Sequence, residues 1–323
     1  MPQFHLGPKL SILNLSYIDL NGNIPSFSDN TKLIALDLSN NNLSGAIPDF
    51  SKNHKLKILD LSDNYLSGGI PDFSKNHNLR KLQLSYNNLV GNIPSFSNNI
   101  DLTLLGVSDN KLSGTIPDFS KNRKLRNLHL SSNNLTGNIP NFINNIGLTK
   151  LYLSNNSLSG IIPDFSKNYM LKRLDLSYNN LTGNIPSFSS NTKLVVLHLS
   201  NNNLSGAVPD FSKNQKLTEL DISYNRLSGD LPSFSNNRRL LLLSLHNNSN
   251  FTYNCPNNKQ LIGPKRNKKL ENCQLGQITF SEGCEFSSML LRNCEIEVIS
   301  NAKSIYYASI VQVSVVLPVL LFI

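Results

Sequence analysis

Residues Leu33–Phe50 read LIALDLSNNNLSGAIPDF, and this stretch decides the fold. Its skeleton, LxxLxLSxNxLSGxIPxF, returns every 23 residues, and the lead leucines of eleven successive copies run from Leu10 to Leu240. A fixed period of this length is the signature of a repeat architecture, in which each copy stacks on its neighbours. The sequence therefore predicts a solenoid of about eleven 23-residue repeats.

Each copy begins with a short strand. Leu36 and Leu38 flank Asp37, and this alternation predicts two inward leucines and one outward aspartate. Asn41 follows three residues later, and its amide has two donors and an acceptor that can satisfy backbone groups where the chain leaves the strand. A column of such asparagines, one per repeat, is expected to form an inward ladder.

The second half of each copy predicts a turn and an apolar filling. Gly45 allows positive φ or a close backbone approach, and Pro48 fixes φ and prevents an ordinary helix interior. Phe50 supplies a large apolar side chain, and a stack of such rings would fill the wider, convex side of the coil.

These residues resemble the plant-type leucine-rich repeat of extracellular receptor domains and polygalacturonase-inhibiting proteins. The resemblance covers roughly residues 1–250 and implies a curved right-handed solenoid of the α/β class, with a parallel sheet on the concave face. The segment LSGxIP implies a second, shorter strand on one flank. The family's usual repeat is one residue longer between the proline and the next lead leucine. The convex segments here are therefore expected to be tight turns or 3₁₀ pieces, which makes the fold mostly β.

The sequence divides into three segments: a solenoid over 1–249, a cysteine-containing cap or juxtamembrane segment over 250–303, and a hydrophobic tail over 304–323. Met1–Phe4 align with the interior of a repeat, at Ile47–Phe50. We therefore expect the native N-terminus and its signal peptide to lie upstream of this sequence, so their absence says nothing of the compartment.

The chain is basic, with a formal net charge of +9. Convex Asp–Lys pairs such as Asp49 and Lys52 are expected to balance one another, and the remaining cations are spread thinly. No basic groove with interleaved aromatics is visible, which argues against nucleic acid as a partner. Weak attraction to an acidic polysaccharide or a membrane surface fits the charge better.

The four cysteines are widely spaced: Cys255, Cys273, Cys284 and Cys294. No CxxC motif occurs, which argues against a zinc site. The even number favours two disulfides with three possible pairings, and four free thiols are the alternative.

The tail from Ile305 to Ile323 carries no charge and is long enough to span a bilayer core. Small residues at Ser300–Ala302 favour cleavage for a GPI anchor, although the polar spacer is short or missing. A plain membrane span and a buried cap strand are the alternatives.

Eight N-x-S/T sequons favour an extracytoplasmic glycoprotein, although the repeat motif itself creates some of them. They begin at Asn14, Asn42, Asn134, Asn155, Asn180, Asn203, Asn247 and Asn250.

The outward strand positions vary while the leucine, asparagine, glycine, proline and phenylalanine columns do not, as a displayed surface permits. Tyrosine and arginine, which dominate interface energies, gather at one place. The predicted ligand site on the concave face is Lys150, Tyr152, Arg173, Asp175 and Tyr178. For each of these residues the alternative is a solvated surface.

No arrangement indicates an enzyme. Asp37, Asp60 and Asp63 form an acidic notch, but an open sheet supplies no cleft around them for the carboxylate pair of a glycosidase. His129 and His198 lie three strands apart, too far for one metal ion. No cofactor, metal site or catalytic residue is predicted.

Three functions are compatible with this sequence. The first is a cell-surface recognition module that binds a protein, peptide or glycan through the concave face and is anchored in the membrane by its tail. The second is a structural or adhesive coat protein, which the uniformity of the repeats favours. The third is a tail-anchored cytosolic scaffold with reduced cysteines. The oligomeric state is not predicted.

The tail predicts membrane attachment of the full-length, signal-bearing protein. If the tail directs GPI attachment, a phosphatidylinositol-specific lipase should release the protein from cells. Retention after lipase treatment, with a C-terminal epitope tag still present, would instead indicate a plain span.

Overall fold

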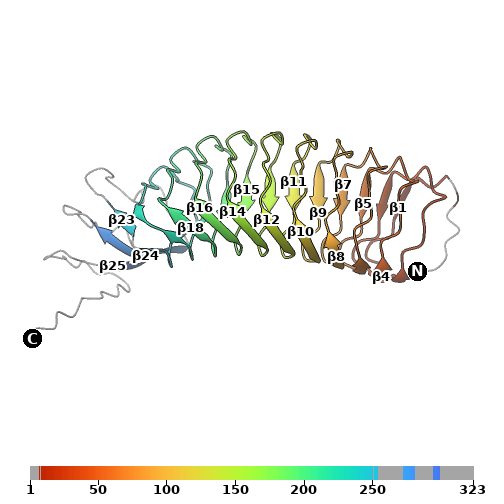
Figure 1. The fold of residues 1–323 in the computed structure, drawn as a ribbon, viewed down its shortest axis with the longest axis horizontal. Helices are drawn as coiled ribbons and strands as arrows, with labels where there is room; N and C mark the ends of the chain where they lie inside the picture. Colours follow the sequence, from red (N-terminus) through yellow and green to blue (C-terminus); the bar gives the residue numbers. More distant parts are fainter. Residues whose placement is uncertain (1–6, 8, 250, 254–271, 281–293, 299–323) are drawn as a thin grey trace, which may run out of the picture. The chain divides into compact units, whose positions relative to one another are not determined.

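The computed structural model describes residues 7, 9–249, 251–253, 272–280 and 294–298 (Figure 1). The chain forms a parallel-strand solenoid of about eleven turns of roughly 23 residues, as predicted. It divides into two compact units, Met1–Pro163 with Lys167–Leu171 (unit 1) and Asp164–Ser166 with Lys172–Ile323 (unit 2). The described residues form strands and turns but no helix. Among them, accordingly, there is no apolar helix that could cross a membrane.

The first sheet of each unit holds the LxL strands side by side. Its registers step by one repeat, so that Leu36 lies opposite Leu59, and Leu59 opposite Leu82. In unit 1 the order is β1 (Ile12–Asn14), β3 (Ala35–Asp37), β5 (Ile58–Asp60), β7 (Lys81–Gln83), β9 (Leu104–Gly106), β11 (Asn127–His129) and β13 (Lys150–Tyr152). In unit 2 it is β15 (Arg173–Asp175), β17 (Val196–His198), β19 (Glu219–Asp221), β22 (Leu242–Ser244), β24 (Asn272–Phe280), β23 (Phe251–Tyr253) and β21 (Gly229–Asp230), with β25 (Cys294–Val298) also on β24.

A second parallel sheet runs along one flank, as the resemblance implies. Unit 1 contributes β2 (Asn21–Asn23), β4 (Asn42–Ala46), β6 (Tyr65–Gly68), β8 (Asn88–Asn92), β10 (Lys111–Thr115), β12 (Asn134–Asn138) and β14 (Ser157–Ile161). Unit 2 contributes β16 (Asn180–Asn184), β18 (Asn203–Gly206) and β20 (Arg226–Leu227). The expectation of a shorter strand is wrong for most turns, because these strands reach 5 residues and the first-sheet strands of the repeats have 3. Their register steps by 21 residues, as from Ser113 to Asn134, so the strands slant (Figure 1).

The interior is filled by the leucine and phenylalanine columns. Phe27, Phe50, Phe73, Phe96 and Phe119 of unit 1 are at most 1% exposed, and their ring centroids lie 6.1–6.5 Å apart in a stack. Between each phenylalanine and the next lead leucine the chain makes two tight turns. In one of them Asn53 N donates to Phe50 O at 2.8 Å, and in the next Leu56 N donates to Asn53 O at 3.0 Å. The prediction of tight turns in place of helix is confirmed.

The predicted asparagine ladder exists and is fully hydrogen-bonded. Asn64 is 7% exposed, and its Nδ2 donates to Leu38 O of the preceding turn at 3.0 Å and to Leu61 O of its own turn at 3.2 Å. Its Oδ1 accepts from Leu43 N at 2.9 Å. One side chain therefore satisfies the buried backbone of two turns at the corner where the strand ends.

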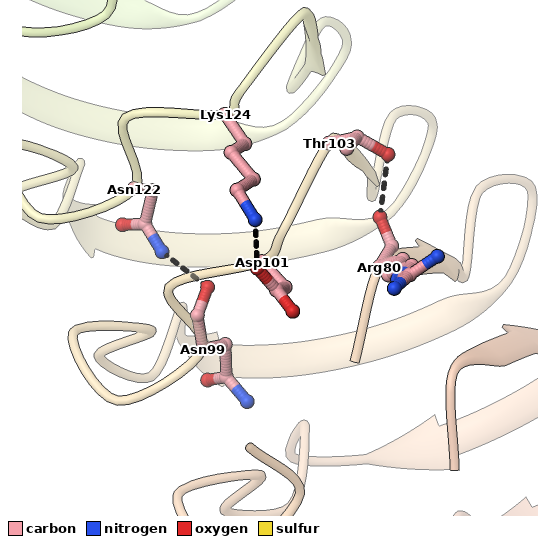
Figure 2. Close-up of polar contacts among 6 residues, drawn as sticks. All are labelled: Arg80, Asn99, Asp101, Thr103, Asn122 and Lys124. Carbon is pink, nitrogen blue, oxygen red and sulfur yellow. Dashed lines mark hydrogen bonds and ion pairs between the residues drawn. The ribbon is translucent and has the colours of Figure 1, made fainter. Parts of the chain in front are cut away.

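A second asparagine ladder, which the sequence analysis did not identify, lies behind the phenylalanines. Asn122 is completely buried, and its Nδ2 donates to Phe96 O and to Asn99 O of the preceding turn, both at 2.9 Å. Figure 2 shows the bond to Asn99 O. The signal was present in the sequence as an asparagine three residues after each repeat phenylalanine from Phe27 to Phe234. Each turn is thus fastened to its neighbour at two corners.

The sequence predicts that convex aspartates pair with lysines, and this prediction is wrong: Asp49 is bonded to a serine. Asp49 accepts from Ser51 N at 2.8 Å and from Ser51 Oγ at 2.6 Å. These hydrogen bonds, more than the charge of Lys52, hold the pKa of Asp49 below its usual value. Among the described residues, Asp49 and Lys52 form no ion pair. The motif encodes an Asx-type turn, in which the aspartate is bonded two residues on.

The C-terminal segments are only partly described. Cys273, in β24, is disulfide-bonded, and its backbone lies in register with that of Cys294 in β25. Cys255, Cys284 and the hydrophobic tail lie outside the described residues. The two disulfides of the cap and the membrane anchor therefore stay predictions.

The turn glycine that recurs in the repeats offers a test with an internal control. Gly137 has φ +77°, and an added Cβ would lie 3.0 Å from Thr115 Cγ2. Gly147 has ordinary φ, and an added Cβ would lie 3.8 Å from Leu125 O. Gly137→Ala should lower the free energy of unfolding by about 1–2 kcal/mol, because alanine is strained at positive φ. Gly147→Ala should leave it unchanged or raise it slightly. Equal urea midpoints for the two variants would contradict this account.

Candidate ligand-binding face

The outward side chains of the first sheet, together with the residues that follow each strand, form what we call the strand face. It is the face that the sequence predicts to be concave. Three residues after each outward strand residue, the backbone turns left-handed, with φ between 52° and 57°. These residues are Tyr17, Asn40, Asp63, Tyr86, Asp109, Ser132, Asn155, Tyr178, Asn201, Tyr224 and Asn247. Asparagine and aspartate tolerate this conformation, whereas a tyrosine there is strained.

Unit 2 has a hollow of about 380 Å³ on its strand face. Its lining is polar and aromatic, with two tyrosines, two histidines, an aspartate and a row of serines. The lining residues are Ser177, Tyr178, His198, Ser200, Asn201, Asp221, Ser223, Tyr224, Leu242, Ser244, His246 and Gln274. Such a volume lies within the range of small-ligand sites and could hold a few residues of a peptide.

Hydrogen bonds within the hollow fix most of its polar groups. Asp221 accepts from Ser223 Oγ at 2.6 Å and from Ser223 N at 3.1 Å. Ser244 Oγ and His246 Nδ1 lie 2.9 Å apart, and the ring of His246 meets that of Tyr224 edge-on at 5.1 Å. The floor of the hollow is therefore pre-organised.

The two tyrosines of the hollow remain open to a ligand. Tyr178 and Tyr224 are 60% and 50% exposed, with φ of 53° and 52°. Both occupy a column in which neighbouring turns have asparagine, a less strained choice. Exposed aromatic rings on strained backbone are a mark of functional sites, because packing does not account for them.

The sequence-predicted site falls in both units. Lys150 and Tyr152 belong to unit 1, in β13, while Arg173 and Asp175 of β15 belong to unit 2 with Tyr178. Only Tyr178 lines the hollow. Asp175 accepts a hydrogen bond from Ser177 Oγ at 2.7 Å, so its carboxylate already takes part in a local turn.

The structure adds residues that periodicity could not supply. His246 follows the last strand of the regular repeat, and Gln274 comes from β24, farther along the chain. Gln274 lines the hollow only because β24 continues the sheet next to β22. Nothing in a 23-residue pattern indicates that pairing.

In unit 1 the strand face carries an aromatic pair. The rings of His129 and Tyr152 lie 4.9 Å apart, and Lys150 stands on the same strand as Tyr152. Burial, and secondarily the charge of Lys150, lowers the pKa of His129 from 6.5 to about 4. His129 is therefore neutral at physiological pH and contributes an uncharged ring to this surface.

The acidic notch of unit 1 is a region of like charge. Burial, followed by the charges of Asp60 and Asp109, raises the pKa of Asp63. Asp37 and Asp60 each accept from the serine two residues on, at 2.7 and 2.6 Å. No group of three histidine, cysteine, aspartate or glutamate side chains in the described part of the chain could hold a metal ion.

Seven of the eight sequon asparagines are described, and all seven are exposed. Asn42, Asn134, Asn180 and Asn203 each open a strand of the second sheet, away from the strand face. Asn14, Asn155 and Asn247 lie on or beside the strand face. Asn250 lies outside the described residues, and glycosylation itself stays a prediction.

The depressed pKa of His129 predicts a pH-dependent stability. Between pH 6.5 and about 4 the unfolded chain binds a proton at His129 that the folded chain does not, so the free energy of unfolding should fall as the pH drops. Replacement His129→Gln should remove this part of the dependence. Urea titrations above pH 6.5 and near pH 4 test it. A variant that loses as much stability as the wild type would show that His129 takes no part.

Three family models match the chain, all of them leucine-rich repeats. Leucine Rich repeats (2 copies) match residues 54–98 and 170–213, Leucine Rich Repeat matches 32–53, 124–146 and 147–168, and Leucine Rich repeat matches 213–230. Together these matches cover more than half of the chain. No curated protein sequence matches it.

The fold is also that of plant receptor ectodomains. The structure of a TDR receptor is 32% identical, with a TM-score of 0.80 over 90% of this chain and 52% of that chain. The Arabidopsis receptor kinase HAESA, in complex with the peptide hormone IDA and the co-receptor SERK1, is 31% identical, with a TM-score of 0.76 over 90% of this chain and 55% of that chain. The chain thus spans about half the length of these receptors. It belongs to the leucine-rich repeat proteins.

Proposed function

We propose that this chain is a non-enzymatic recognition module that binds a peptide or protein ligand on its strand face, on the extracellular side of a membrane. The observation that carries the proposal is the hollow of unit 2, where Tyr178 and Tyr224 stand exposed on left-handed backbone. The solved HAESA complex, with its peptide hormone, supports a peptide as the ligand class.

The chemistry of the hollow suits a peptide. Rigid tyrosine rings offer large contact areas at low entropic cost, and serine hydroxyl oxygens can accept hydrogen bonds from main-chain N–H groups. A small number of placed polar groups among aromatic walls is the usual composition of a specific site. Lys150, Tyr152, Arg173 and Asp175 stay proposed contributors on the strand face. The sequons, the predicted disulfides and the hydrophobic tail support membrane-anchored display outside the cell.

A structural or adhesive role is the second candidate, favoured by the near-identity of the core columns from turn to turn. The two candidate functions differ in whether they give the strained tyrosines a role. A protein selected only for regularity has no use for Tyr178 where asparagine would fit at lower cost.

The replacement Tyr178→Asn tests both proposals. Asparagine already occupies the same position at Asn155 and Asn201, so the variant should fold and should gain about 1 kcal/mol in its free energy of unfolding. The probe is a peptide selected from a random display library for binding to the wild-type chain. It is the tightest-binding peptide that a second selected peptide displaces, which shows that both bind at the same site. Its affinity should fall about tenfold or more in the variant, as for an aromatic anchor.

Tyr65→Ser is the matched control. Tyr65 is 60% exposed, stands on β6 of the second sheet, and shares its column with Ser157. This variant should keep both affinity and stability. If no selected peptide distinguishes Tyr178→Asn from the wild type, the strand-face site is wrong and the structural role gains.

A further inference from the structure

A row of side chains on the turns behind the phenylalanine stack departs from the repeat in unit 1. The second residue before each lead leucine is polar at Thr31, His54 and His77. The next four positions are Ile100, Arg123, Ile146 and Tyr169, which we call the turn row. Ile100 and Ile146 are each 59% exposed and Tyr169 is 50% exposed. The core of each turn is already filled by phenylalanine and leucine, so these side chains do not serve packing.

The turn row is held on rigid backbone. Each of its members directly follows an asparagine of the second ladder, and hydrogen bonds of 2.9 Å link these asparagines from turn to turn. The asparagines are Asn99, Asn122, Asn145 and Asn168. Ile143 and Met170, also exposed, widen the apolar surface beside Ile146 and Tyr169. The row is therefore a fixed surface rather than a set of loose loops.

A hollow of about 570 Å³ opens around Arg123. Its lining residues are Ile100, Asp101, Ser120, Lys121, Arg123, Lys124 and Asn144, with three cations and one carboxylate. The carboxylate is already engaged, because Lys124 Nζ lies 2.5 Å from Asp101 Oδ1 (Figure 2). That contact, more than the charge of Arg80, holds the pKa of Asp101 low.

Lys121 and Arg123 are the cations of this hollow without an ion pair in the described part of the chain, and Arg123 is the better suited of the two to a carboxylate. The charge of Lys121 acts on Asp118, whose carboxylate also accepts from Ser120 Oγ at 2.6 Å. Arg123 has no carboxylate within ion-pair distance in the part of the chain that the structure describes. Its planar guanidinium is suited to hold a carboxylate with two hydrogen bonds.

The spacing of the turns defines the shape of a partner. Beneath the row, the rings of Phe96 and Phe119 lie 6.4 Å apart, and the rings of the preceding turns of unit 1 are spaced by 6.1–6.5 Å. In an extended peptide, side chains on one face repeat about every 6.6–6.8 Å, twice the rise of a strand. A peptide laid along the row could therefore place alternate side chains over Ile100, Arg123, Ile146 and Tyr169.

We propose that the turn row binds an extended acidic segment of a partner protein, whose alternate residues are apolar, acidic, apolar and apolar. The acidic residue pairs with Arg123, and the apolar residues pack on Ile100, Ile146 and Tyr169. A polyanionic polysaccharide or nucleic acid would match the charge but would leave the aliphatic side chains uncovered. The segment is distinct from the ligand of the strand face.

The test uses the full chain and two fluorescent peptides, Leu-Ser-Glu-Ser-Leu-Ser-Leu and its reverse, because the row does not fix the direction. One of them should bind saturably. Arg123→Ala and Ile146→Ser should each weaken binding about tenfold, as should glutamine in place of the peptide's glutamate. The peptide with lysine at that place should bind Arg123→Glu better than it binds the wild type.

Arg238→Ala is the matched control. Arg238 occupies the same column in unit 2, and its neighbour one turn earlier is the polar Gln215. This variant should bind the peptide as the wild type does, and so should Tyr178→Asn. The proposal is wrong if neither peptide binds, if Arg238→Ala weakens binding as much as Arg123→Ala, or if the glutamine peptide binds as well as the acidic one. If heparin displaces the peptide and Ile146→Ser leaves peptide binding unchanged, the turn row is a polyanion site instead.

Discussion

The amide side chain that reaches back across one turn is the interaction on which this fold depends. The first-sheet strands of the repeats have only 3 residues, so sheet hydrogen bonds alone leave both corners of each turn with buried, unpaired backbone. Asn64 closes one corner and Asn122 closes the other, each with bonds to its own or the preceding turn. Apolar burial drives the turns together, but the amides fix how one turn sits on the next. These amides therefore also set the spacing between equivalent surface residues on successive turns.

Periodicity predicted the core because the core repeats. The inward leucines, the stacked phenylalanines and the positive-φ glycines each follow from one residue type at one position, and each is confirmed. The same reasoning assigned Asp49 to Lys52 because opposite charges three apart look like a pair. Asp49 bonds the nearer hydroxyl of Ser51 instead of Lys52, because the contact with Ser51 does not require a long, mobile side chain to be ordered.

The candidate site was less accessible to sequence reasoning because it lies where the period ends. Tyr178 could be named from its column, whereas His246 and Gln274 enter the hollow only through the pairing of β24 with β22. Left-handed backbone was also missed, although a column of asparagine and aspartate with occasional tyrosine carries that signal. The hollow, the backbone strain and the strand pairing depend on the three-dimensional structure. The sequence pattern can indicate the residues involved but not how they are arranged.

The left-handed column has a consequence for how such a surface can evolve. Asparagine, aspartate, tyrosine and histidine have codons that differ only in their first base, so one nucleotide change converts one into another. Three of these four residue types already occupy the column, among them Asn201, Asp63 and Tyr224. The backbone there accepts each of them, at differing cost, while the ladders hold the coil unchanged. A lineage can therefore sample acidic, amide and aromatic chemistry at a position on the strand face by point mutation, without passing through unfolded intermediates.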